Sequence, residues 1–179
     1  GVQTCALPIS ALFDLNGGSF TTAPGAGETV TSVGTCSIGV TNGTLILGAN
    51  SYLDDFTGSL DVQSTGSLVI VDERWLTNTT SIQLAGDFNA SGLASLTYSG
   101  VADATYSGAL VLSGVNTSAI FTSGAAGGDL TLSGAVSGTG NLLVGPDAGS
   151  TARITLALTG GFTGRTTIFG GDALIQTQA

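Results

Sequence analysis

Residues 129–176 read DLTLSGAVSGTGNLLVGPDAGSTARITLALTGGFTGRTTIFGGDALIQ. Short runs in this stretch alternate apolar residues with threonine or alanine: LTL at 130–132, ITLAL at 154–158 and TTI at 166–168. Alternation with a period of two gives a strand one apolar face and one polar face, as in a half-buried β-strand. Glycine-rich corners separate the runs at 137–140, 160–161 and 170–171. The stretch therefore predicts short strands joined by tight corners.

The same alternation continues upstream, at 43–48, 58–62, 66–71 and 81–85. On one face of these segments lie apolar residues, which we expect to point into the core: Leu45, Leu47, Leu60, Val62, Leu68, Ile70, Ile82 and Leu84. We expect the serine and threonine residues of these segments to face solvent. A strand with one apolar face needs a second layer to cover that face.

A five-residue motif recurs along the chain: an apolar residue, any residue, an apolar residue or tyrosine, a small residue, and glycine. Its copies begin at positions 82, 96, 110, 130 and 156, so the motif is fixed while the spacers between its copies vary. A motif of this kind, repeating at about 20 residues, is typical of a solenoid. Coiling stacks each strand on its equivalent one turn later, at ~4.8 Å, and buries the apolar faces along the axis.

We therefore predict an all-β fold, with residues 10–179 forming a single parallel β-helix. At about 20 residues per coil, this length predicts roughly eight coils. Each end would expose an unpaired strand edge. Because no capping helix is apparent near either end, we expect uncapped ends and interpret the chain as a fragment of a longer rod.

Composition and charge exclude several classes of function. Hydrophobic residues make up 42% of the 179 residues and charged residues 8%, and the formal net charge is −9. A chain this acidic is repelled by nucleic acid and by anionic lipid surfaces. It also lacks an apolar run of the ~20 residues that a membrane-spanning helix needs. We expect neither a nucleic-acid partner nor a helical membrane span.

The first nine residues, GVQTCALPI, resemble the translation of a common sequencing adapter. We interpret residues 1–9 as a non-native scar and exclude them from the fold. In that case Cys5 is not native, and a disulfide between Cys5 and Cys36 would have no biological meaning. Cys36 is then best interpreted as a small buried residue.

Residues 156–174 combine several elements of a known repeat. A Leu-x-Leu-x-Gly strand at 156–160 is followed by an aromatic-Thr-Gly corner at 162–164 and a Thr-x-Ile strand at 166–168. Gly170-Gly171 comes next, with one extra residue, Ala173, before the expected Leu174. The segment 130–140 is similar to the half that precedes these elements. Together they resemble the autotransporter-associated β-strand repeat, also called the passenger-associated transport repeat; the full match covers 129–176.

This resemblance implies a right-handed parallel β-helix in the passenger of a type V secreted bacterial protein. Such a passenger is exported across the outer membrane to the cell surface or the extracellular space, where it can act as an adhesin. The repeat would aid export and folding, next to an outer-membrane β-barrel translocator that lies outside this sequence. The expected partners are a host-surface or polysaccharide ligand.

The residues themselves offer little chemistry. Histidine is absent and the three basic residues are Arg74, Arg153 and Arg165, so the usual bases for serine or cysteine nucleophiles are missing. We therefore predict no catalytic residue, no cofactor and no metal site. The favoured function is a structural stalk, and the chain is not expected to be an enzyme.

Two acidic pairs leave an alternative open. Asp54-Asp55 and Asp72-Glu73 could be solvated turns, or could contact a ligand or Ca²⁺. Adjacent residues of a strand point to opposite faces, so the pairs must lie in turns to act together. Trp75, which follows the second pair in an expected protruding loop, could stack on a sugar or cover the side of the coil. The alternative function is thus a β-helical polysaccharide lyase or hydrolase that uses surface carboxylates.

Overall fold

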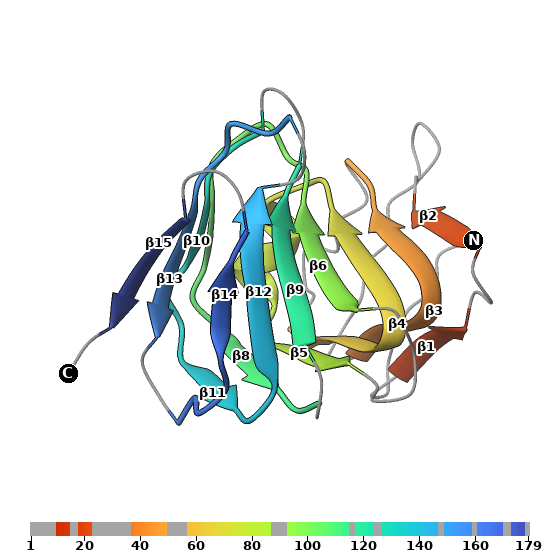
Figure 1. Cartoon of the computed structure of the whole chain (residues 1–179). Coiled ribbons are helices and arrows are strands. Elements are labelled where there is room, and N and C mark those ends of the chain that lie inside the picture. The colour runs from red at the N-terminus through yellow and green to blue at the C-terminus, as the bar shows by residue number, and fades with distance from the viewer. Residues whose placement is uncertain are drawn as a thin grey trace.

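The computed structural model describes residues 10–14, 18–22, 37–49, 57–86, 93–114, 117–123, 127–146, 149–158, 161–169 and 173–177. Segment 1–9, Cys36 and the pair Asp54-Asp55 lie outside these residues. The described chain is nearly all β and winds into a parallel solenoid of about 5 turns (Figure 1). The predicted all-β parallel β-helix is therefore confirmed.

The coil has three sides, each a stack of parallel strands. Side 1 consists of β1 (Ser10–Asp14), the first halves of β3 (Ser37–Leu47) and β4 (Ser59–Ile70), β5 (Ser81–Gly86), β8 (Ala109–Leu112) and β11 (Val136–Gly138). Side 2 consists of β2 (Ser19–Thr22), the second halves of β3 and β4, β6 (Ala94–Tyr98), β9 (Thr117–Thr122), β12 (Asn141–Pro146) and β14 (Thr166–Ile168). Side 3 begins with the one-turn helix α1 (Arg74–Asn78), which contacts β7 (Ala104–Tyr106), and continues with β10 (Leu130–Leu132), β13 (Ile154–Leu158) and β15 (Ala173–Thr177).

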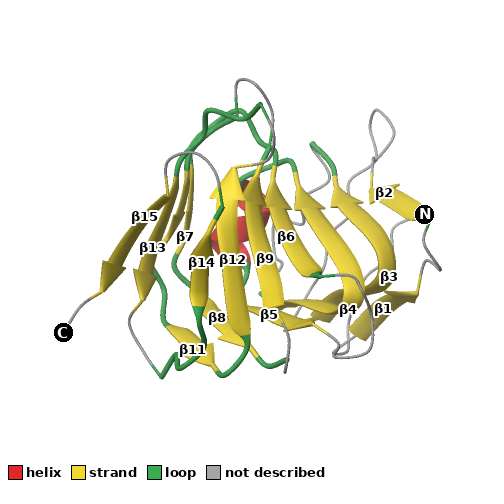
Figure 2. Ribbon diagram, in the orientation of Figure 1, coloured by secondary structure: helices red, strands yellow, loops and turns green. Residues whose placement is uncertain are grey.

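The coil turns in the right-handed sense. In Figure 1 the side 2 strands β6, β9 and β12 point upward, the side 3 strands β13 and β15 point downward, and the chain advances from right to left. Figure 2 shows α1, the first element of side 3, behind the side 2 strands. Upward in front, downward behind and leftward along the axis is a right-handed path, as expected for crossovers between parallel strands.

The register between turns gives the length of the repeat. On side 2, Leu96 pairs with Ile120, Ile120 with Val144 and Val144 with Ile168, so the partners advance by equal steps. Two side-chain hydrogen bonds between neighbouring turns span the same step of 24 residues. The step from β13 to β15 is shorter, and the step from β5 to β8 is longer. The expectation of about 20 residues per coil and roughly eight coils is therefore wrong, because most turns are longer.

The spacing of the recurring motif gives too short a coil because copies of the motif lie on different sides of the coil. Ile82 and Leu110 pair with each other on side 1, whereas Leu96 lies on side 2 and Leu130 on side 3. The short step from Ile82 to Leu96 thus carries the chain from one side to the next within a turn. Every side uses the same alternation, so the pattern marks strands without marking turns.

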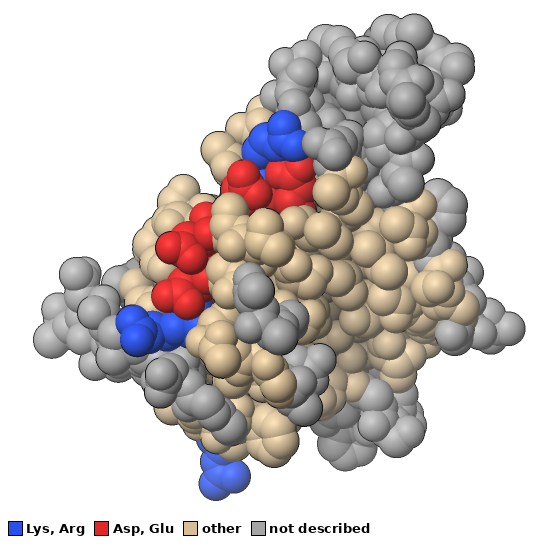
Figure 3. Space-filling view, turned by 90° about the horizontal axis from the view of Figure 1, so that it is seen from above, with Lys and Arg blue, Asp and Glu red and all other residues tan. Residues whose placement is uncertain are grey.

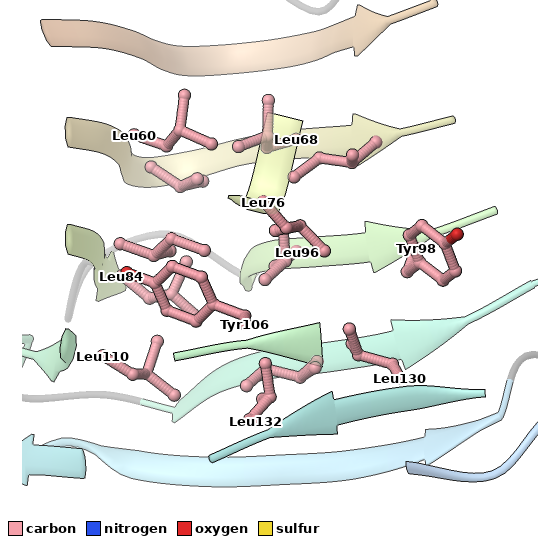
Figure 4. Close-up of a cluster of buried hydrophobic side chains, with 14 of the residues drawn as sticks. Leu60, Leu68, Leu76, Leu84, Leu96, Tyr98, Tyr106, Leu110, Leu130 and Leu132 are labelled. Carbon is pink, nitrogen blue, oxygen red and sulfur yellow. The ribbon is translucent and has the colours of Figure 1, made fainter. Parts of the chain in front are cut away.

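Inward-facing residues of the three sides form one continuous core (Figure 4). The predicted inward residues are all at most 1% exposed: Leu45, Leu47, Leu60, Val62, Leu68, Ile70, Ile82 and Leu84. Tyr98 and Tyr106 join them as the largest fully buried side chains. Burying a leucine or isoleucine contributes roughly 1.5–3 kcal/mol, so each turn is held mainly by this stripe.

The corners use two different devices. Where β3 and β4 bend from side 1 to side 2, Asn42 and Ser64 adopt φ values of 52° and 53°, and the Thr65 hydroxyl donates to Asn42 Oδ1 at 2.9 Å. At Gly134 the reason for glycine is space, since a Cβ there would collide with the carbonyl oxygen of Gly108 one turn earlier. Close stacking of turns, as well as left-handed backbone, therefore selects small residues at the corners.

Candidate functional site

The acidic pair Asp72-Glu73 lies where β4 ends and α1 begins. The prediction of a protruding loop at these residues is wrong, because Asp72 is buried and the chain continues directly into α1. Trp75 N–H donates to the carbonyl oxygen of Asp72 at 3.2 Å, and Leu76 N–H donates to that of Glu73 at 3.0 Å. These bonds fold the segment back on the coil as the first element of side 3.

Arg74 holds the Asp72 carboxylate. The backbone N–H and Nε of Arg74 donate to Asp72 Oδ1 at 3.1 and 2.8 Å, and Nη2 forms an ion pair with Oδ2. A guanidinium that binds both carboxylate oxygens compensates the removal of this charge from water. Asp72 is thus engaged within the chain, while the Arg74 side chain stays 41% exposed.

Trp75 packs into the core rather than against solvent. Its side chain is 3% exposed, in the same cluster as Leu76, and the Thr79 hydroxyl donates to its carbonyl oxygen at 2.5 Å. α1 presents both apolar residues to the interior and contacts β7 on the next turn. In this position the indole has little free surface with which to stack on a sugar.

Tyr98, at the end of β6, lies one turn after the corner of Asp72 and Glu73, since it is the register partner of Ile70. Its hydroxyl donates to the carbonyl oxygen of Ala102 at 2.6 Å. Burial, followed by the negative charges of Glu73, Asp72 and Asp103, raises the pKa of Tyr98 to about 12. These carboxylates therefore lie close enough to one phenol to disfavour its ionised form.

Asp103 and Asp129 extend the acidic residues along side 3. Asp129 N–H donates to Asp103 Oδ1 at 2.9 Å, and Arg153 N–H donates to Asp129 Oδ1 at 2.7 Å. Each carboxylate thus accepts the amide of the equivalent residue one turn later, just before β10 and β13 begin. We call Asp72, Glu73, Asp103 and Asp129 the acidic row: the first two lie just before α1, next to Arg74, and Asp129 accepts the amide of Arg153. Figure 3 shows acidic side chains gathered in a row on this face of the molecule, with basic side chains near both of its ends.

The acidic row was not expected from the sequence, although a signal for it exists. The pattern D-x-T-x-S-G occurs at 103–108 and again at 129–134, and its two copies stand in register on β7 and β10. Asp103 is a single acid without an acidic neighbour, so a search for adjacent acidic pairs does not detect it. A repeat of single acids at the coil length indicates stacked corners.

The row mainly supports the backbone. One oxygen of Asp103 and one of Asp129 accept amides, and both oxygens of Asp72 bind Arg74. Within the described ranges, no group of three or more His, Cys, Asp or Glu residues is arranged to hold a metal ion. Asp54 and Asp55 lie outside these ranges, so their predicted contact with a ligand or Ca²⁺ stays a prediction.

The three arginines lie on three different turns. Arg74 belongs to the turn of β4, Arg153 precedes β13, and Arg165 precedes β14. Arg165 donates its backbone N–H to Asn141 Oδ1 at 3.0 Å, which repeats on side 2 the corner bond that Asp129 makes on side 3. Basic groups are thus spread along the coil, as the sequence predicts.

Comparisons of the chain with family models, with curated proteins and with solved structures found no match. Within the described residues, no helix has the length and apolar character that crossing a membrane requires. The resemblance of 129–176 to the autotransporter-associated repeat therefore stays a prediction from the sequence.

Proposed function

We propose that the chain is a structural β-helical stalk in the passenger of a bacterial autotransporter-like protein, which is secreted or displayed at the cell surface. The observation that carries the proposal is the stack of parallel strands that continues on sides 2 and 3 through the repeat-like stretch. There Leu130 pairs with Ile154 and Ile154 with Ala173, two successive steps of side 3. The residues that resemble the transport repeat are thus scaffold.

Side-chain chemistry supports a stalk as well. Leucine, isoleucine and valine fill the interior, while outward positions such as Thr131 and Thr155 carry hydroxyls. Three acids of the acidic row, Asp72, Asp103 and Asp129, bind Arg74 or a backbone amide. A stack in which each turn contacts only its neighbours can be lengthened without changing its local packing, which suits a spacer.

The same architecture supports a role in export and folding. A turn that emerges from the outer membrane can pair with the folded turn before it, because each strand offers the next one a complete edge. Stability then grows by one neighbour interface per turn. This stepwise folding fits the role that the resemblance implies for residues 129–176, and a ligand-binding role as an adhesin would be carried by its irregular corners.

The proposal can be tested in the bacterium that encodes the chain. Antibodies raised against the purified chain should label intact cells or the culture medium, and external protease should remove the label from intact cells while a periplasmic marker survives. Labelling only after permeabilisation of the cells would refute display at the surface. Purification from the cytoplasm of the native host would refute export.

A second assay separates the stalk from the polysaccharide lyase or hydrolase. The purified chain is incubated with acidic polysaccharides, with and without Ca²⁺, and released reducing ends and unsaturated products are measured. We expect no turnover. Turnover that is abolished by Asp55→Ala, with Asp61→Ala as a matched control on β4, would overturn the structural proposal.

A further inference from the structure

Side 3 has a helix where the other two sides have strands. The sheet of side 3 has the order β15-β13-β10-β7, and α1 contacts β7 from the turn before it. On sides 1 and 2 the strands of these same two turns pair directly, β5 with β8 and β4 with β6. The edge of β7 that faces α1 therefore lies within the length of the coil, with turns on both sides of it.

The hydrogen bonds of β7 show which of its backbone groups face α1. Ala104 N–H donates to the carbonyl oxygen of Asp129 at 2.8 Å. Ser133 N–H donates to the carbonyl oxygen of Tyr106 at 2.9 Å. Neighbouring residues of a strand direct their backbone groups to opposite edges, so the N–H and C=O groups of Thr105 face α1. No strand in the described part of the chain pairs with this edge.

The backbone ladder between the two turns is intact before and after α1. Ser99 N–H donates to the carbonyl oxygen of Ile70 at 2.9 Å, and Ala109 N–H donates to that of Thr80 at 3.1 Å.

The chain between these flanks has the length of a strand crossing. Ile70 is the register partner of Tyr98, and Ser81 is that of Ala109. The two segments between these partners, which cross side 3 in successive turns, are therefore equal in length. An extended conformation of residues 71–80 would reach from one flank to the other without moving either.

Two side chains favour the helix over such a strand. In the helix Trp75 and Leu76 are buried together, at 3% and 2% exposure. In a strand of the same register Leu76 would be the partner of Ala104 and stay inward, and Trp75 would point outward. Asn78 would become the partner of Tyr106, whose side chain is fully buried. Placing an amide side chain in this apolar core costs free energy.

The helix has little stability of its own. α1 spans five residues, and its N-cap residue, Glu73, makes no capping hydrogen bond with its side chain. Isolated helices of this length do not persist in water, so α1 depends on the packing of Trp75 and Leu76.

We propose that residues 71–80 are a conformational switch with two states, α1 and a strand that pairs with β7. Trp75 and Asn78 hold the segment in the helical state. The strand state completes side 3 in this turn, gives Thr105 a partner strand and transfers Trp75 from the core to solvent. Both states use the same flanks and the same length of chain, so the exchange between them needs no movement of the adjacent turns.

Two probes distinguish the states. Trp75 is the single tryptophan of the chain, so its emission and its quenching by acrylamide report whether this side chain is buried. Hydrogen exchange of the Thr105 amide, followed by NMR, reports whether a strand pairs with this edge of β7. In the wild type we expect a shielded Trp75 and a Thr105 amide that exchanges faster than the Tyr106 amide, which faces β10.

Asn78→Val should move the segment to the strand state, because it places an apolar, β-branched side chain at the inward position. The emission of Trp75 should shift to longer wavelength and its quenching should rise, while exchange of the Thr105 amide should slow by about tenfold or more. The matched control is Thr77→Val, which introduces the same side chain at an exposed position that would face outward in the strand. It should change neither probe.

An Asn78→Val chain in which Trp75 stays shielded and the Thr105 amide stays fast would overturn the proposal. So would any result in which the two probes disagree, because the strand state requires both changes, and so would a Thr77→Val chain that behaves like Asn78→Val. Far-UV circular dichroism checks folding. If Asn78→Val is unfolded, the double variant Trp75→Thr, Asn78→Val replaces it, because it also removes the side chain that the helix buries. A fast Thr105 amide in the double variant, folded or not, would overturn the proposal.

Discussion

Asp129 N–H donates a hydrogen bond of 2.9 Å to Oδ1 of Asp103, the equivalent residue one turn earlier, and so joins two turns through a side chain as well as through their strands. Asp129 in turn accepts the amide of Arg153 at 2.7 Å. The corner thereby satisfies amides that precede the strands of side 3, which would otherwise depend on water. Its cost is the stacking of two negative charges at the separation of adjacent turns.

Replacing Asp129 should separate these two effects. Asp129→Ala removes the acceptor for Arg153 N–H and should lower the free energy of unfolding by about 1 kcal/mol. Asp129→Asn keeps an acceptor oxygen and removes the repulsion from Asp103, so it should be as stable as the wild type or more stable at low salt. Urea denaturation at low and high salt measures both. Equal losses for the two variants would show that the acceptor has no role.

Replacing Ser118 should increase the stability of the chain. Its hydroxyl is a buried group with no hydrogen-bond partner among the described residues, on β9 between Ala94 and Leu142 of the adjacent turns. Removing an unpaired buried hydroxyl should raise the free energy of unfolding, so we expect Ser118→Ala to stabilise the chain by about 1 kcal/mol.

The matched control is Thr79→Val, which removes the buried hydroxyl that donates to the carbonyl oxygen of Trp75. It should lower the free energy of unfolding by about 1 kcal/mol. Both are measured by urea denaturation. A change in the free energy of unfolding in the same direction for both variants would contradict these roles of the two hydroxyls.

The pH dependence of stability should reveal Tyr98. Its pKa is about 12 in the folded chain and about 10 when unfolded, so between these values the folded state holds more protons. The stabilisation is complete below pH 10 and is lost as pH rises through 12, with a size on the order of 1–2 kcal/mol. The urea midpoint of unfolding should therefore fall more between pH 9 and pH values above 11 for the wild type than for Tyr98→Phe. An equal fall of the urea midpoint in the two chains would contradict the assignment of this stability loss to Tyr98.

Glycines at stacked corners should differ sharply from glycines on open surface. Gly134→Ala places a Cβ against the carbonyl oxygen of Gly108, and moving two backbones apart should cost about 1–3 kcal/mol. Gly161 has no atom within 4 Å of its would-be Cβ, so Gly161→Ala should be neutral or slightly stabilising. Thermal unfolding of the two variants checks this contrast. A neutral Gly134→Ala would contradict the close stacking of turns.

Local alternation was sufficient to predict the strands and the core. Pairs such as Leu60 and Val62, or Ile82 and Leu84, lie on one face of any extended strand, whatever that strand packs against. The same pattern contains no information about which side of the coil a strand occupies. The short step from Ile82 to Leu96 therefore suggests a turn in the sequence, although it leads only from one side to the next.

The corner at α1 could not be predicted for a different reason. Asp72 and Arg74 are charged, and Trp75 is aromatic. No periodicity in the sequence indicates that the Asp72 carboxylate is buried in a pair with Arg74. Burial of such a residue depends on a partner that tertiary structure supplies. Asp103 is comparable, since its role depends on the amide of Asp129 on the next turn.

The most direct measurement for the account is a disulfide between neighbouring turns. Thr131 and Thr155 are register partners on side 3 and point away from the core, so cysteines there, in a Cys5→Ser and Cys36→Ser background, should form a disulfide readily on mild oxidation. Thr131 with Thr151, the pair that a coil of about 20 residues would align, should not. A band shift on non-reducing electrophoresis for the first pair alone would support a stalk built from stacked turns of this register. Efficient cross-linking of the second pair would contradict this register, and so would a failure of both pairs to cross-link.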